Sequence, residues 1–224
     1  MPTVVSDLYG EIVIPASVVD VESFLAWIDR ADLPEKLPVS FIKGEVRVDL
    51  AMEELFSHNQ IKTALGIALG GLIERDDLGL FVTDGMLLAN EAAELVTGPD
   101  AIFISRAAMR DKRVRFVAGK QRGAVATRIV GTPDLVVEVV SRSSEEVDTE
   151  WLMSAYHNAG IPEYWVIDAR KGDIRFDIYL RRMKEFTAVR RSGGWLKSAA
   201  FGKSFRLMRT EMENGYPRFK LEIR

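Results

Sequence analysis

The sequence contains no cysteine and only two histidines among its 224 residues. Disulfide bonds and thiolate metal sites are therefore excluded, and a structural zinc site lacks the ligands it needs. No apolar run approaches the roughly 18–20 residues that cross a bilayer as a helix. The first residues, MPTVVSDLYGEIVIP, have no basic segment before an apolar one, unlike a signal peptide. We therefore expect a cytoplasmic protein that does not enter a membrane.

The net charge of −3 conceals an uneven distribution along the chain. Residues 170–224 contain fifteen Lys and Arg residues and six acids, a net charge of +9, and the rest of the chain carries −12. A segment this basic is typical of a surface that faces a polyanion. The alternative is a solvated surface whose acidic counterparts come from other segments.

Hydrophobic periodicity predicts helices and strands that alternate along the chain. We expect helices at 17–30, 57–78 and 143–160, strands at 40–50, 79–89, 100–105 and 134–141, and a β-hairpin at 163–182. Ser57 with Gln60, and Ser143 with Glu146, have the spacing of helix capping boxes. The order predicts a mixed α/β fold with one central sheet flanked by helices. Residues 1–35 are expected to form an N-terminal helical appendage, and residues 36–224 the main domain.

The strand in GTPDLVVEVV, residues 131–140, is apolar except for Asp134 and Glu138. A buried carboxylate costs several kcal/mol unless it is paired or binds a metal. These two acids share one face of the strand but lie about 13 Å apart, which is too far for one cation. A partner for Glu138 must therefore come from another strand, and Asp100 opens the similar segment GPDAIFIS. Asp100 and Glu138 on neighbouring strands would form an oxygen site suited to Mg²⁺.

Each acid also has a purely structural interpretation. A Pro-Asp pair at the start of a strand is common turn chemistry, because the Asp side chain bonds its own backbone. Glu138 could instead pair with an arginine or lie on a half-exposed face. His58 is interpreted either as a site residue or as a plain polar residue in the first turn of the long helix.

The segments GPDAIFIS and GTPDLVVEVVSRSSEEVDTEWLMSAYHNAGIPEYWVID resemble the Uma-two family of restriction endonucleases, within the PD-(D/E)XK nuclease superfamily. The resemblance is strongest over residues 98–168. It implies a restriction-endonuclease-like sheet flanked by helices, with a C-terminal β-hairpin, and hydrolysis of phosphodiester bonds with Mg²⁺ or Mn²⁺. By the same resemblance Asp100 and Glu138 are the metal ligands and catalytic residues, and Glu45 in KGEV is a third catalytic acid. Asp134 and His58 would then have supporting roles.

One departure from the superfamily pattern concerns the catalytic lysine. The superfamily places a lysine two residues after the glutamate, where this chain has Val140. Relatives often place it four residues before the tyrosine of the Y--AG motif, where this chain has Leu152. Arg142 is a candidate substitute, but an arginine does not readily release a proton.

Three functions remain open from the sequence. The first is a Mg²⁺-dependent DNA endonuclease that uses Asp100 and Glu138. The second is a catalytically impaired protein with the nuclease fold, which binds nucleic acid or a protein partner without cutting. The third is a hydrolase of another substrate with paired carboxylates, such as a glycosidase, which the basic segment disfavours. We expect DNA as the partner and leave open whether the chain forms a homodimer.

Overall fold

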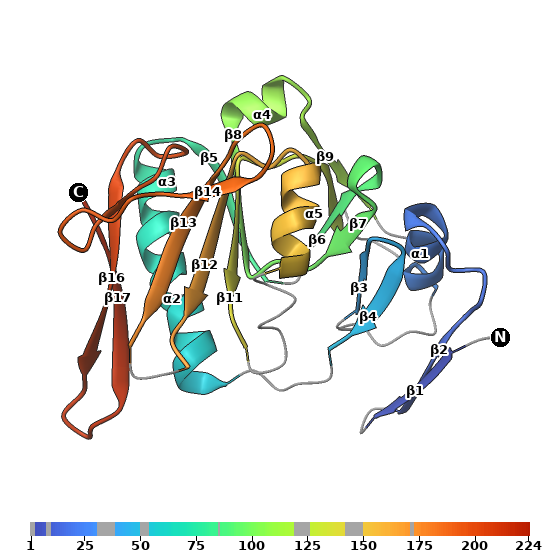
Figure 1. Ribbon diagram of the computed structural model, residues 1–224, viewed down its shortest axis with the longest axis horizontal. Helices are drawn as coiled ribbons and strands as arrows, with labels where there is room; N and C mark the ends of the chain where they lie inside the picture. Colours follow the sequence, from blue (N-terminus) through green and yellow to red (C-terminus); the bar gives the residue numbers. More distant parts are fainter. Residues whose placement is uncertain are drawn as a thin grey trace.

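Two six-stranded sheets with helices packed on and between them form most of the computed structural model (Figure 1). The structure describes residues 3–7, 10–30, 39–49, 54–84, 86–118, 126–141, 150–170 and 173–224. The mixed α/β class predicted from the periodicity is confirmed. The prediction of one central sheet missed the second six-stranded sheet.

The first sheet carries the two acid-containing strands at its centre. Its order is β14 (Phe186–Ala188), β13 (Arg175–Arg181), β12 (Glu163–Asp168), β11 (Leu135–Val139), β8 (Ala101–Ser105) and β5 (Gly79–Thr83). Strands β11 and β12 are parallel, whereas all other neighbours are antiparallel. The predicted hairpin at 163–182 is confirmed as β12 and β13. The sheet is therefore mixed, as the resemblance implied.

The second sheet lies on the other side of α5 from the first (Figure 1). Its order is β4 (Glu45–Val48), β3 (Val39–Ile42), β7 (Leu95–Thr97), β6 (Leu87–Asn90), β10 (Arg128–Gly131) and β9 (Val114–Val117). Strands β6 and β10 are its parallel pair. The short helices η3 (Glu91–Ala93) and α4 (Arg106–Arg110) connect strands in this region. The predicted strand at 40–50 is in fact a hairpin of β3 and β4.

Residues 55–75, called here the long helix, cover one face of the first sheet (Figure 1). They run as η1 (Leu55–Asn59), α2 (Gln60–Leu65), η2 (Gly66–Gly70) and α3 (Gly71–Arg75), where η1 and η2 are π-helical. The predicted N-cap, Ser57, is wrong. The Glu54 side chain caps the helix instead, because its carboxylate accepts a 2.6 Å hydrogen bond from the Ser57 amide.

Helix α5 (Leu152–Asn158) packs between the two sheets, with Leu152, Ala155 and Tyr156 buried (Figure 1). It ends before Gly160, whose φ of +76° suits a residue without a side chain. The predicted cap of this helix, Ser143 with Glu146, lies outside the described residues. Helix α5 therefore separates the sheets and presents one face to the first of them.

The N-terminal residues form a hairpin and a helix on the outer face of the second sheet. Strands β1 (Thr3–Asp7) and β2 (Gly10–Ile14) precede α1 (Val21–Ile28), so the expected appendage is not only helical. Asp20 caps α1, which lies within the helix predicted at 17–30, in a capping box with Ser23. Phe24 packs on Phe41 of β3, with ring centroids 5.6 Å apart. The segment thus shares a hydrophobic cluster with the second sheet.

The C-terminal residues form a three-stranded sheet of β15 (Leu196–Lys197), β16 (Ser204–Glu211) and β17 (Pro217–Ile223). This sheet stands beside the long helix (Figure 1), and Phe205 and Phe219 join the cluster beneath that helix. The predicted C-terminal hairpin is present as β16 and β17. None of the helices in the described part of the chain is long and apolar enough to cross a membrane.

Candidate active site

Glu138 lies on the most enclosed strand of the first sheet. Leu135 and Val139 of β11 pack toward the long helix, whereas Val136 packs toward α5. Glu138 shares the face of Val136 because residues two apart in a strand point the same way. Its side chain is only 6% exposed, and its Oε1 accepts a 2.5 Å hydrogen bond from the Tyr156 hydroxyl. The buried carboxylate therefore faces α5, which supplies it with a donor.

Asp100 lies directly across from Glu138. Strands β8 and β11 pair antiparallel with Ala101 opposite Val137, and one further step of this register places Asp100 opposite Glu138. The Asp100 amide lies 3.4 Å from Oε2 of Glu138, which accepts its hydrogen bond. Directly opposed residues of two strands have Cβ atoms about 5 Å apart. The structure thus brings the two acids together at one end of the β8–β11 pair.

An aspartate closes each end of this strand pair. At one end the Val139 amide donates a 2.7 Å hydrogen bond to Oδ2 of Asp100. At the other end the Ser105 amide donates a 2.7 Å hydrogen bond to Oδ2 of Asp134, and Arg113 donates a hydrogen bond to Oδ1 of the same carboxylate. Asp134 therefore stabilises the entrance of β11, at the opposite end from Glu138.

The long helix adds two basic side chains to the acidic pair. His58 and Lys62 are four residues apart and lie on the helix face that covers the sheet. Nε2 of His58 lies 3.4 Å from Oδ2 of Asp100, and Nζ of Lys62 lies 3.5 Å from Oδ1 of the same carboxylate. Both residues are as buried as Glu138, at 6% exposed. The Asp100 carboxylate is thus enclosed by two basic groups.

A further acid, Asp84, holds Lys62 from the solvent side. Nζ of Lys62 donates a 2.7 Å hydrogen bond to Oδ1 of Asp84, whose side chain is 55% exposed. The Asp84 amide donates to the Asp100 carbonyl oxygen at 3.2 Å, which fixes the end of β5 beside the start of β8. The Lys62 ammonium therefore bridges a buried carboxylate and a largely exposed one.

Tyr156 remains protonated in this environment. Burial first, and then the negative charge of Glu138, raise the pKa of the Tyr156 phenol well above its usual range. The phenol therefore acts as a hydrogen-bond donor at neutral pH, and it orients the Glu138 carboxylate from α5.

The donor set suits a hard divalent cation. Mg²⁺ is usually bound by one or two carboxylates, with water and substrate phosphate as its other ligands. Asp100 and Glu138 supply such carboxylates. Among the residues that the structure describes, no three His, Asp or Glu side chains gather so as to hold a metal ion. The site therefore fits a cation that keeps several waters.

The third predicted catalytic acid, Glu45, comes from the second sheet. Glu45 opens β4 at the edge of the second sheet, and its 62% exposed carboxylate lies 3.6 Å from Arg47. Strand β4 pairs with β3 of the second sheet. Arg142 lies outside the described residues.

Sequence reasoning missed Lys62 and Asp84 as neighbours of the site. Lys62 falls within the buried arc of the long helix, between Ile61 and Leu65, which are both fully buried. A charged residue inside an apolar helix face is the same signal that singled out Glu138 in its strand. Asp84 carries no such signal, because it follows β5 in an ordinary turn position.

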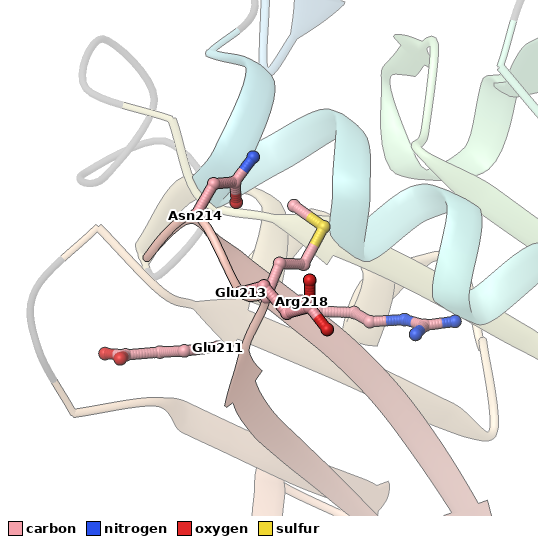
Figure 2. Close-up of a pocket in the computed structure, with 5 residues that line it drawn as sticks. Glu211, Glu213, Asn214 and Arg218 are labelled. Atoms are coloured by element: carbon pink, nitrogen blue, oxygen red, sulfur yellow. The ribbon is translucent and has the colours of Figure 1, made fainter.

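Hollows in the surface lie on the side of the C-terminal sheet. One of about 280 Å³ is lined by Phe56 and Ser57, next to His58 in sequence, and by Arg170 and Arg209. Another, of about 520 Å³, lies at the tip of the β16–β17 hairpin, where Figure 2 shows Glu211 and Arg218 extending in opposite directions. Its charged side chains do not converge, so we place the candidate site at Asp100 and Glu138.

A sequence profile of the Uma-two family, described as "Putative restriction endonuclease", matches residues 21–202. The chain belongs to this family. The matched residues include Asp100, Glu138, Lys62 and Tyr156. Strands β16 and β17 follow the matched segment.

The fold is also that of a solved relative. A crystal structure of a "putative nuclease belonging to DUF820" from Anabaena variabilis ATCC 29413 superposes with a TM-score of 0.60 at 14% sequence identity. The match covers 82% of this chain and 91% of that chain. No curated protein matches this sequence. At this identity the likeness shows the fold alone, so the chemistry is argued from the residues of the site.

Proposed function

We propose that this member of the Uma-two family is a metal-dependent endonuclease that hydrolyses phosphodiester bonds in DNA. The observation that carries the proposal is the placement of Asp100 opposite Glu138 at the buried end of the β8–β11 pair. Two carboxylates placed opposite each other supply the oxygen ligands that a hard divalent cation takes.

Each residue has a role in this proposal. Asp100 and Glu138 hold Mg²⁺ or Mn²⁺, which when bound lowers the pKa of a water and offsets charge on the phosphate. The Val139 amide and the Tyr156 hydroxyl orient the two carboxylates. In the hydrolysis, water oxygen bonds to phosphorus while the bond from phosphorus to one sugar oxygen breaks. The attacking water loses a proton, and the departing sugar oxygen gains one.

The basic C-terminal segment supplies the proposed contacts to DNA phosphates. Part of its charge is neutralised in the fold, because Arg175 and Arg191 pair with Asp177, and Arg206 pairs with Glu222. Arg209 is exposed and lines the hollow beside the start of the long helix. Phosphates bound there would lie near the helix that carries His58.

A second candidate function is binding without cleavage. It is favoured by the apolar residues at both positions where relatives place the catalytic lysine. Val140 is 1% exposed and Leu152 is 4% exposed, and both belong to the cluster around α5. A protein that keeps the carboxylates and lacks any substitute for that lysine would bind a metal and nucleic acid but cut poorly.

The deciding experiment measures metal binding and cleavage together. Wild type and Glu138→Gln are titrated with Mn²⁺ by calorimetry and incubated with supercoiled plasmid and Mg²⁺ or Mn²⁺. Wild type should bind and nick, and Glu138→Gln should do neither. Metal binding and DNA binding without nicking would select the second candidate. If Glu138→Gln binds Mn²⁺ as wild type does, the assignment of the metal site is wrong.

A further inference from the structure

We propose that Lys62 of the long helix is a catalytic residue of this nuclease and does the work of the lysine missing at positions 140 and 152. This inference rests on the endonuclease function proposed above. In it, the Lys62 ammonium contacts a non-bridging oxygen of the scissile phosphate and the attacking water beside Asp100. It stabilises developing negative charge there and transfers no proton.

The position of the ammonium carries the inference. Nζ of Lys62 lies 3.5 Å from Oδ1 of Asp100, and Asp100 lies across the β8–β11 pair from Glu138. A phosphate oxygen on a cation held by these carboxylates would be within a few ångströms of the same point, since Mg²⁺–oxygen distances are about 2.1 Å. Lys62 thus reaches Asp100 from the long helix, whereas positions 140 and 152 belong to the cluster around α5.

The contact with Asp84 shows from which side a substrate would arrive. Asp84 is 55% exposed and Asp100 is 13% exposed, so the ammonium lies between solvent and the buried end of the site. A lysine has three donors, and it can exchange the Asp84 oxygen for a phosphate oxygen while it keeps Asp100. Asp84 therefore fixes the position of the ammonium before substrate binds, and a substrate phosphate then replaces Asp84 as the hydrogen-bond acceptor.

The burial of Lys62 makes such a group effective. At 6% exposed, its ammonium is largely removed from water, where its interaction with a developing charge is stronger than at an exposed position. The helix fixes its stem between Ile61 and Leu65 of the core, so little reorganisation is needed during reaction. A lysine on a flexible surface loop would have neither advantage.

A purely structural role makes a different prediction for cleavage. If Lys62 only neutralises the carboxylates when no metal is bound, it competes with the metal. Its removal would then tighten metal binding and leave cleavage by the metal-loaded protein unchanged. The two roles are therefore separated by cleavage at saturating metal, and metal affinity measured on the same variants shows that the metal is still bound.

The test uses Lys62→Met, Lys62→Gln and the control Lys112→Met in the full chain. Methionine matches the apolar part of the lysine side chain. Glutamine can still donate a hydrogen bond to Asp84, and this variant is used if the methionine variant does not fold. Lys112 is exposed after α4, at the far end of β8 from Asp100. Mn²⁺ affinity is measured by calorimetry, and single-turnover cleavage is measured with plasmid DNA at saturating Mn²⁺.

We expect both Lys62 variants to cleave about 10²–10³-fold more slowly than wild type, the cost of one electrostatic donor. Their Mn²⁺ affinity should be equal to wild type or tighter, and Lys112→Met should match wild type in both measurements. Equal cleavage by wild type and the Lys62 variants would overturn the role of Lys62 and leave the nuclease function standing. Loss of Mn²⁺ binding in the variants would also overturn it. Failure of wild type itself to cut, with its metal bound, would instead reject the nuclease function.

Discussion

The Tyr156 hydroxyl lies 2.5 Å from Oε1 of Glu138, so α5 donates a hydrogen bond into the centre of the first sheet. The phenol is fully buried and its pKa is raised, which keeps the proton on the tyrosine. The carboxylate is therefore oriented from one side by α5. On the other side, its Oε2 accepts the Asp100 amide hydrogen bond.

Tyr156→Phe should weaken Mn²⁺ binding by about 10–100-fold, because a partner that orients a metal ligand is worth that much. It should also lower the free energy of unfolding by about 1–3 kcal/mol, since a buried carboxylate loses a donor. Calorimetric titration and urea denaturation measure the two effects. Tyr179→Phe, on β13, is the control and should keep wild-type Mn²⁺ affinity. Unchanged affinity in Tyr156→Phe would show that this bond does not orient a ligand.

The raised pKa of Tyr156 predicts a stability change at alkaline pH. The unfolded chain releases the phenol proton near pH 10, whereas the folded protein keeps it. This contribution to stability is complete below about pH 10 and is lost as the pH rises further, by up to about 1.4 kcal/mol per pH unit. Urea denaturation between about pH 9 and pH 11 should show a steeper loss for wild type than for Tyr156→Phe. Parallel curves would contradict the assignment.

The two acids of β11 should behave differently on neutralisation. Glu138→Gln should abolish Mn²⁺ binding. Asp134→Asn should leave that binding intact and lower the free energy of unfolding by about 1–3 kcal/mol, because the Ser105 amide and Arg113 lose a charged acceptor. Thermal melts and calorimetry on both variants make the comparison. Loss of metal binding in Asp134→Asn, with the fold retained, would mean that the site extends along the whole strand.

Arg209→Ala should reduce the salt dependence of DNA binding. One lost phosphate contact lowers the slope of log affinity against log salt by about 1. Arg110→Ala is the matched control, because Arg110 is 73% exposed on α4, away from the candidate site. Fluorescence anisotropy with a short duplex at several salt concentrations gives both slopes. Equal slopes for the two variants would remove Arg209 from the DNA-binding surface.

Leu152→Lys tests the relation between this chain and its relatives. From the sequence alone, a lysine at this position is expected to raise cleavage, because Leu152 lies one turn before Tyr156 on α5. With Lys62 already beside Asp100, we expect no gain in the wild-type background. In the Lys62→Met background it should restore part of the lost 10²–10³-fold in rate. An equal gain in both backgrounds would mean that the two lysines act independently.

Local signals predicted several elements correctly. The helix predicted at 17–30 contains α1, the hairpin at 163–182 is present, and Asp100 lies opposite Glu138 on the neighbouring strand. In each case the information lies within a few residues or in one unusual acid among apolar neighbours. Strand periodicity and capping chemistry are sufficient for such elements.

The pairing of strands that are far apart in the chain could not be predicted from the sequence. The second sheet joins β3 to β7 and β6 to β10, with about forty or more residues between the paired strands, and its strands have three or four residues. Such short strands carry little periodicity, and their partners follow from the whole fold. Lys62 was missed for a related reason, since a lysine in a helix is usually solvated.

Asp100 and Asp134, which close the two ends of the β8–β11 pair, make the candidate site depend on correct strand register. A slip of one residue between these strands would break both 2.7 Å hydrogen bonds at once, to Val139 and to Ser105. The same slip would remove Glu138 from its place opposite Asp100. A shift of one residue also reverses the faces of the side chains in a strand, so Glu138 would point toward the long helix instead of α5. A chain that misfolds in this way therefore loses the carboxylate pair along with its stability. Correct register of β8 and β11 is therefore a condition for the proposed chemistry, and only correctly folded molecules meet it.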